Sequence, residues 1–187
     1  MRLENAFDVP ATPERAWQLL NDVPRVVPCM PGAELVEVAG ENAWKAKLHV
    51  KLGPIALQFL ADIAREEMDE ASGRVVLAVK AREAKGRGSA EATLESRLAP
   101  AAEGTHVDIA TDLALRGAVA QYGRGVVADV AGNLTEQFAR CIAAKLADAA
   151  EEPGTAPEEL EAPPAAIGGL RLMFGALWNA VFRRSRR

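Results

Sequence analysis

Apolar and polar residues alternate without interruption in WKAKLHVKL, residues 44–52. One side of this stretch carries Trp44, Ala46, Leu48, Val50 and Leu52, and the other carries Lys45, Lys47, His49 and Lys51. Successive side chains of a β-strand point to opposite faces, so the pattern predicts a strand with one buried and one solvated face, as in antiparallel sheets. The alternation returns after Gly53-Pro54, in residues 55–63, 75–81, 90–98 and 107–115. The middle of the chain therefore predicts a curved antiparallel meander.

The segments on either side of this meander complete the fold. Residues 3–9 alternate as a first strand, and Thr12 and Pro13 then supply the N-cap and first position of a short helix. A second short helix, near residues 21–27, ends at the proline-bounded turn 28–32. Residues 118–147 return to a period of 3.6 and predict one long helix. This order predicts an α+β helix-grip fold, in which a curved antiparallel sheet wraps around a long C-terminal helix.

Five segments, in this order along the chain, resemble a known family. They are MPGAEL (30–35), VKLGPI (50–55), GRGSA (86–90), Gly117 with AQYGRG (120–125), and QF (137–138). On these segments the chain resembles, over about residues 1–147, the family of the carbon monoxide dehydrogenase CoxG subunit, within the START-like, Bet v 1-like (SRPBCC) superfamily. The resemblance implies an accessory protein that recruits a molybdenum-containing carbon monoxide dehydrogenase, or a related hydroxylase, to the inner face of the cytoplasmic membrane.

Small residues on the expected inward faces raise the question of a cavity. Alanines at 46, 61, 81, 90 and 92 either let sheet and helix approach closely or leave an apolar space between them, and the sequence leaves both readings open. The superfamily resemblance implies a cavity for a hydrophobic small molecule. Candidate lining residues are Trp44, Leu48, Phe59, Ala61, Leu77, Ala90, Ala92, Ile109, Leu113, Tyr122 and Val126. Candidate residues of its mouth are Gly117, Gly123 and Gly125. These glycines could instead serve close helix-to-strand packing, and Trp44 could instead belong to the core.

An isoprenoid quinone is the ligand that best suits a membrane-held cavity protein beside an oxidoreductase, because it is a lipid-soluble acceptor for the electrons. This choice of a quinone, or another lipid, rests on no ligand motif and is a hypothesis. No covalent cofactor or metal is predicted, since no His, Asp or Glu cluster has the spacing of a metal site.

Two other functions stay open. A START-like enzyme, a cyclase or dehydratase, would need an ionisable pair that points inward, and the expected register offers only Asn5, Ser96 and Thr111 as inward polar residues. No nucleophile with a base is recognisable either, so no enzymatic activity is predicted. The other alternative is a pure interaction adaptor with a filled core. Nucleic acid is not a predicted partner, because the domain is acidic and its basic residues are scattered.

The last part of the chain divides by charge into a linker and a tail. Residues 149–164 hold five Glu, no basic residue and several prolines, which predicts an acidic tether after a domain of residues 1–148. Residues 165–187 hold five Arg and no acid. On a helix, one side of this tail would collect Ile167, Leu170, Met173, Phe174, Leu177, Trp178, Val181 and Phe182, followed by Arg183, Arg184, Arg186 and Arg187.

This tail predicts an amphipathic anchor that lies on an anionic membrane surface. As a helix, residues 167–182 would reach only about 24 Å, short of the roughly 30 Å hydrocarbon core, and Arg171 would be costly inside it. Each terminal arginine would add about 1 kcal/mol of attraction to an anionic leaflet. A last core helix, or a segment that binds a partner protein, is the alternative interpretation.

The cysteines and the first residues predict a cytoplasmic protein. Cys29 and Cys141 lie far apart in sequence and form no CxxC pattern, which predicts two separate buried thiols in a reducing compartment and no metal site. Residues 1–5 lack the apolar core of a signal peptide. We therefore expect a protein that is peripheral on the inner face of the cytoplasmic membrane.

Overall fold

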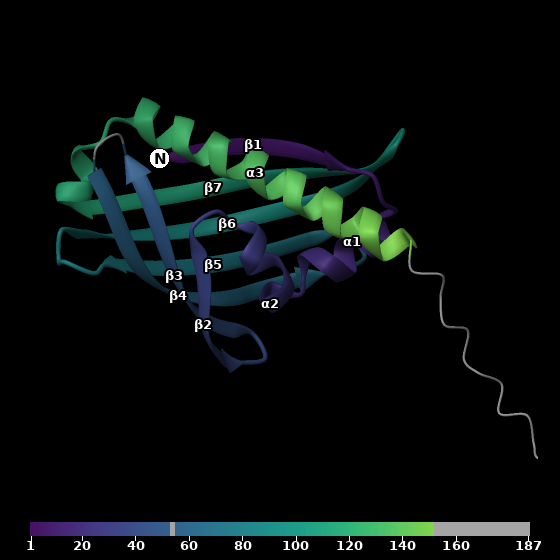
Figure 1. The fold of residues 1–187 in the computed structure, drawn as a ribbon, viewed down its shortest axis with the longest axis horizontal. Coiled ribbons are helices and arrows are strands. Elements are labelled where there is room, and N and C mark those ends of the chain that lie inside the picture. Colours follow the sequence, from purple (N-terminus) through teal and green to yellow (C-terminus); the bar gives the residue numbers. More distant parts are fainter. Residues whose placement is uncertain (53–54, 152–187) are drawn as a thin grey trace, which may run out of the picture. The chain divides into compact units, whose positions relative to one another are not determined.

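The computed structural model describes residues 1–52 and 55–151 (Figure 1). The elements in chain order are β1 (Arg2–Val9), α1 (Pro13–Leu20), α2 (Val23–Val26), the 3-10 helix η1 (Val27–Cys29), β2 (Ala33–Gly40), β3 (Ala43–Leu52), β4 (Ile55–Asp69), β5 (Arg74–Glu83), β6 (Gly88–Ala101), β7 (Gly104–Gly117), the 3-10 helix η2 (Ala118–Gln121) and α3 (Arg124–Glu151). Among these residues, seven strands form one antiparallel sheet in the order β1-β7-β6-β5-β4-β3-β2. The sheet is curved and α3 crosses one of its faces, which confirms the predicted helix-grip fold.

The register of β3 and β4 follows the alternation of the sequence. Trp44 lies opposite Ile63, Ala46 opposite Ala61 and Leu48 opposite Phe59. Trp44, Ala46 and Phe59 are buried, whereas the lysines at 45 and 51 are exposed. We call the face that carries α1, α3 and these apolar residues the concave face.

Strand β2 was not among the predicted strands. It lies at one edge of the sheet and pairs only with β3, with register shifts after Leu35 and after Val38. Six of its eight residues, 34 and 36–40, are exposed, including Val36 at 50% and Val38 at 58%. Because an edge strand with bulges buries little on either face, its sequence carries no clear alternation.

The long C-terminal helix starts later than predicted. Residues 118–121 form η2, Tyr122 is extended with φ −68° and ψ 122°, and α3 begins only at Arg124. The backbone N–H of Ala118 donates to the Arg87 carbonyl at 2.8 Å, so the first turn is bound to the β5–β6 hairpin. This tertiary contact interrupts the helix that the period of 3.6 predicts.

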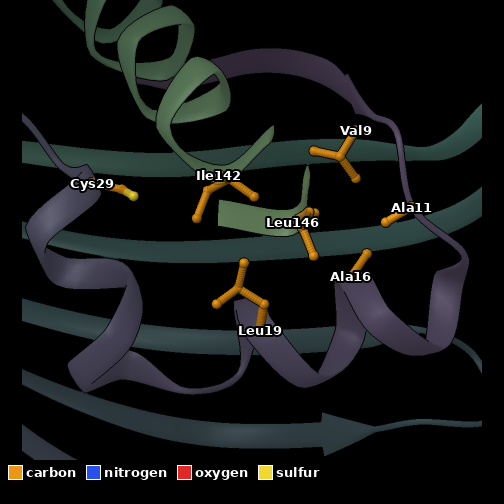
Figure 2. Packing of buried hydrophobic residues seen from close by; sticks show 7 residues of the cluster. All are labelled: Val9, Ala11, Ala16, Leu19, Cys29, Ile142 and Leu146. Carbon is orange, nitrogen blue, oxygen red and sulfur yellow. The ribbon is translucent and has the colours of Figure 1, made fainter. Parts of the chain in front are cut away.

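The main core lies where α3 passes over α1 and the end of β1. Figure 2 shows its members, which come from segments far apart in the sequence: Val9, Ala11, Ala16, Leu19, Cys29, Ile142 and Leu146. Ile142 is fully buried, and Phe7 and Phe138 pack edge to face beside it with ring centroids 6.0 Å apart. This cluster fixes the C-terminal half of α3 on the domain.

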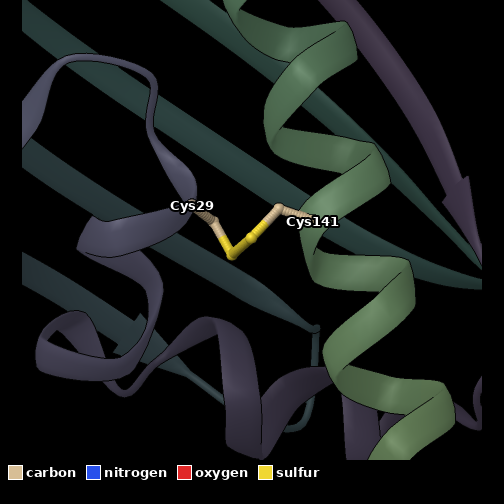
Figure 3. The surroundings of a disulfide bond; sticks show 2 residues. All are labelled: Cys29 and Cys141. Carbon is tan, nitrogen blue, oxygen red and sulfur yellow. A yellow bond between two sulfur atoms is a disulfide. The ribbon is translucent and has the colours of Figure 1, made fainter.

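A disulfide joins Cys29 at the end of η1 to Cys141 on α3 (Figure 3). Their Cα atoms are 5.3 Å apart although the residues are 112 positions apart in sequence. The prediction of two separate thiols is therefore wrong, because α3 folds back across the sheet to the α2–η1 segment. Disulfides persist in oxidising compartments, so the cysteines no longer support a cytoplasmic location.

The predicted linker and tail lie almost wholly outside the described residues. Helix α3 continues to Glu151, into the segment 149–164 that was predicted as linker. Every residue proposed for membrane contact, from Ile167 to Arg187, falls outside. Within residues 1–52 and 55–151, no helix is long and apolar enough to cross a membrane.

Candidate functional site

Apolar side chains in the middle of the concave face stay partly exposed. Among the strands, α3 packs mainly against β1, so the strands in the middle of the sheet receive little cover from it. The residues concerned are all half-buried and come from β3 to β7: Leu48, Ala61, Leu77, Ala90, Ala92, Ile109 and Leu113. We call this set the concave apolar surface. All seven were predicted to line a cavity.

Of the remaining predicted lining residues, some pack in the core and one is exposed to solvent. Phe59 is buried with Leu57, Ala81 and Val119, and Tyr122 packs against this cluster. Trp44 is buried in a different cluster with α2 and η1, and the Arg65 guanidinium lies 5.3 Å from the centre of its rings. Val126, on the first turn of α3, is 44% exposed.

The three predicted mouth glycines have different surroundings. Gly117 has φ +75°, and a Cβ added there would lie 2.8 Å from the Gly88 Cα and 2.9 Å from the Arg87 carbonyl oxygen. Gly117 therefore permits close packing of β6 and β7 and does not open a mouth. A Cβ at Gly123 or Gly125 would meet nothing within 4 Å, so both border open space at the start of α3.

An ion pair at the end of β5, with a buried carboxylate and a half-buried arginine, was missed by the sequence reasoning. Glu83 is 4% exposed and continues the inward positions 75, 77, 79 and 81 of its strand. Its Oε1 accepts from Arg87 Nη2 at 2.7 Å, and its Oε2 accepts from the backbone N–H groups of Lys85 at 2.8 Å and Arg87 at 3.1 Å. Alternation extended by one more step, from Ala81 to Glu83, was the signal that could have found it.

The environment of Glu83 keeps its carboxyl group ionised. The hydrogen bond from Arg87 and those from the two backbone N–H groups outweigh burial and lower the pKa of Glu83 from 4.5 to about 2. The same hydrogen bond raises the pKa of Arg87, and the nearby Tyr122 phenol adds a smaller contribution in the same direction. At neutral pH the pair is therefore charged on both sides.

Two pockets are lined mainly by residues that alternate with the inward positions of their strands. One, of about 180 Å³, is lined by His49, Ala56, Leu57, Gln58, Glu83, Ala84, Lys85 and Arg87. The other, of about 390 Å³, is lined by Arg2, Glu4, Asn5, Glu95, Arg97, Asp108, Ile109 and Ala110. The larger pocket is mostly charged and includes only Ile109 of the predicted lining residues. The smaller pocket is lined by Glu83 and Arg87 and also by Leu57, which packs with Phe59, Ala81 and Val119.

Acid should destabilise the domain through Glu83 and Glu95. Hydrogen bonds from Arg74, and then from Arg97, lower the pKa of Glu95 to about 2, as Arg87 does for Glu83. Since both carboxyls titrate near 4.5 in the unfolded chain, their contribution to stability is complete above that pH and is lost as the pH falls toward 2.

We expect the midpoint of urea unfolding, measured from pH 7 to pH 2, to fall steeply below about pH 4.5 in the natural chain. Glu83→Gln should lower the midpoint at pH 7 and reduce the slope below pH 4.5. Glu66→Gln, at an exposed position of β4, is the matched control. An unchanged acid slope in Glu83→Gln would contradict this assignment.

In the part of the chain that the structure describes, no group of three or more His, Cys, Asp or Glu side chains lies close enough together to bind a metal ion. What its concave face offers is apolar contact, together with one charged pair at the end of β5.

Comparison with known proteins gives one family and a set of related folds. A family model described as the CoxG subunit of carbon monoxide dehydrogenase matches residues 6–147. A search of curated protein sequences finds no significant match.

Three solved structures illustrate the similarity of fold. A conserved protein from Geobacillus kaustophilus is 23% identical, with a TM-score of 0.71 over 80% of this chain and 97% of that one. The Zhui aromatase/cyclase from a Streptomyces species is 14% identical, with a TM-score of 0.59 over 83% and 99%. A START superfamily protein from Mycobacterium smegmatis is 12% identical, with a TM-score of 0.54 over 79% and 98%. At these identities the structures show a shared fold.

Proposed function

Because the chain belongs to the CoxG family of carbon monoxide dehydrogenase subunits, we propose that it is an accessory protein that recruits a carbon monoxide dehydrogenase-type molybdenum oxidoreductase to the membrane. In this proposal the helix-grip domain also binds a hydrophobic small molecule, and the basic tail binds an anionic membrane surface. The family match supports the recruitment part of the proposal, and the concave apolar surface is the observation that carries the binding of a hydrophobic small molecule.

Partly exposed apolar side chains on a concave face favour a hydrophobic ligand. Exposed apolar area costs free energy in water, and a ligand that covers Leu77, Ile109 and Leu113 would recover it. A quinone suits this surface, because its ring and hydrocarbon chain are apolar and because it can accept electrons from a neighbouring oxidoreductase.

A START-like cyclase or dehydratase is the second candidate, and the Glu83–Arg87 pair is the observation that favours it. Such an enzyme needs an ionisable pair facing the ligand, and Glu83 occupies an inward position. However, a general acid or base works best with a pKa near the pH of the reaction, and the pKa of Glu83 is about 2. Both Glu83 oxygens also accept hydrogen bonds within the hairpin. The pair therefore suits a structural or binding role better than proton transfer.

Flotation with vesicles tests the membrane part of the proposal. We expect the full chain to float with phosphatidylglycerol-rich vesicles and a version that ends at Pro164 to stay at the bottom of the gradient. Replacing the four terminal arginines by glutamine should remove about 4 kcal/mol of attraction, which is roughly a thousandfold in partition at low salt. The matched control replaces four exposed arginines of the domain by glutamine: Arg25, Arg82, Arg116 and Arg140. Equal flotation of the full and shortened chains would contradict the anchor.

Extraction of the same two proteins tests ligand binding separately. Organic extracts are analysed by mass spectrometry for isoprenoid quinones and other lipids. If the domain holds the ligand, quinone should be recovered from both versions in similar amounts. Recovery from the full chain alone would assign the lipid to the tail, and an empty extract from both would favour the adaptor with a filled core.

A further inference from the structure

We propose that the outer face of strands β3, β4 and β5 is the surface with which this protein binds the oxidoreductase that it recruits, and that the oxidoreductase meets it with an acidic surface. The inference rests on the proposed recruitment of that enzyme and adds where the two proteins touch. This face lies on the side of the sheet away from α1 and α3 (Figure 1). We call it the convex basic surface, and its members are Lys47, Lys51, Leu60, Lys80 and Arg82.

The register of the sheet brings these side chains together. Successive residues of a strand point to opposite faces, so the positions that alternate with the inward ones point outward. Lys47 lies opposite Leu60, and Leu60 lies opposite Arg82, so two cations flank the leucine in one row across three strands. Lys51 and Lys80 occupy outward positions of the same two outer strands. The row and these two lysines form one continuous surface.

The four cations of this surface are available to a partner. Within residues 1–52 and 55–151, the side chains of Lys47, Lys51, Lys80 and Arg82 take part in no ion pair. The domain of residues 1–148 holds 17 basic and 21 acidic residues, so the basic surface does not follow from its composition. A positive surface of this kind on an acidic domain favours an acidic partner.

The other half of the outer face shows the opposite arrangement. There, on β1, β6 and β7, the cations pair within the chain: Arg2 approaches Asp112 at 3.3 Å, and Arg97 approaches Glu95 at 2.8 Å. Charges that serve solubility alone would need no such division between the two halves. The division points to binding at the half where the cations stay available.

Leu60 gives the convex basic surface an apolar centre. Its side chain is 49% exposed, with Lys47 and Arg82 on either side. Specific protein interfaces have an apolar core within a polar rim, and this row has that arrangement. Three strands about 4.8 Å apart and about 30 Å long offer a small footprint, which suits a reversible contact.

An acidic protein fits this surface better than a lipid bilayer does. Asp62 lies opposite both Lys45 and Lys80, and Glu34 lies opposite Lys47, so acids interrupt the cations. A uniformly anionic membrane would repel these acids, whereas a protein can place charges that match both signs. We therefore assign the convex basic surface to the oxidoreductase and the membrane contact to the tail.

Binding of the full chain to the purified molybdenum oxidoreductase of the same organism, measured by biolayer interferometry at low salt, tests the inference. Lys47→Glu/Arg82→Glu should weaken the affinity at least about tenfold, because it places like charges against the acidic partner. The matched control is Arg25→Glu/Arg140→Glu, which changes the net charge equally on α2 and α3, on the other side of the sheet. The control should bind within about twofold of the natural chain.

A second pair of variants leaves the charge untouched. Leu60→Ala should weaken binding about fivefold, as expected for the centre of an interface. Met68→Ala is its control, because Met68 is 52% exposed and lies eight residues further along the same strand. Melting temperatures of all four variants should stay within a few degrees of the natural chain's, since these side chains lie at the surface.

Three results would overturn the inference while recruitment still stands. They are unchanged binding of both surface variants, equal losses in the surface variants and their controls, and a role of this surface on lipid. The last would appear if the chain that ends at Pro164 floated with phosphatidylglycerol-rich vesicles and Lys47→Glu/Arg82→Glu stopped it. If the natural chain does not bind the oxidoreductase at all, the proposed recruitment fails, and the docking surface fails with it.

Discussion

Removing the disulfide is expected to lower the free energy of unfolding by about 4–5 kcal/mol, which corresponds to a melting temperature roughly 10–15 °C lower for a domain of this size. The bond joins residues 112 positions apart, so it restricts the unfolded chain strongly. It also ties α3 to η1, beside the main core. Calorimetry of Cys29→Ser/Cys141→Ser, compared with the natural chain under non-reducing conditions, measures the effect.

A reducing agent provides the internal control for this experiment. It should lower the melting temperature of the natural chain to that of the double variant and leave the double variant unchanged. Titration of accessible thiols in denaturant should find none before reduction and two after it. Equal melting temperatures of the natural chain and the double variant under non-reducing conditions would show that the bond contributes nothing to stability in solution.

Truncation of Ile142 should have the second largest effect. Ile142→Ala is expected to cost about 2–5 kcal/mol, because the side chain is fully buried between α3 and α1 and its loss leaves a cavity. Ile142→Val should cost only about 1 kcal/mol, since a single methyl group is removed. Urea unfolding at neutral pH measures these differences in the free energy of unfolding. An unchanged dependence of that free energy on urea concentration is the check that unfolding stays two-state.

The same helix supplies the control for this series. Val126 also belongs to α3 but is 44% exposed, so Val126→Ala should change the free energy of unfolding by about 0.5 kcal/mol or less. If Ile142→Ala were as mild as Val126→Ala, the C-terminal half of α3 would not be clamped by the main core. The helix-grip arrangement would then depend on the disulfide.

Most strands of the sheet could be predicted because apolar and polar residues alternate strongly along them. Strand β2 could not, because its alternation is weak. Residues 44–52 separate lysines from apolar residues completely, so their strand and its facing could be read from the chain. Residues 33–40 carry Glu34 and Glu37 among apolar residues, and bulges shift the register of β2. An edge strand with little to bury leaves no periodic signal. The late start of α3 was hidden for another reason, because it depends on the contact between Ala118 and Arg87.

The candidate site could be predicted only where it follows from strand facing. The seven residues of the concave apolar surface were found because every second residue of a strand shares a face. The Cys29–Cys141 bond could not be found in this way, since it depends on where α3 comes to rest on α1 and η1. The hydrogen bonds of Arg87 depend on the geometry of the four-residue turn between β5 and β6, which positions its guanidinium against Glu83 and the Ala56 carbonyl.

The order of strands in the sheet has a consequence for the newly made chain. Among the seven described strands β1 is made first, yet its one neighbour among them is β7, with Arg2 opposite Asp112 and Val9 opposite Thr105. At about 5–20 residues per second, roughly 5–20 s pass between the synthesis of these two strands. During this interval Leu3, Phe7 and Val9 have no strand beside them. This strand is thus among the last to be paired, and until β7 is made its unpaired edges are free to pair with other strands.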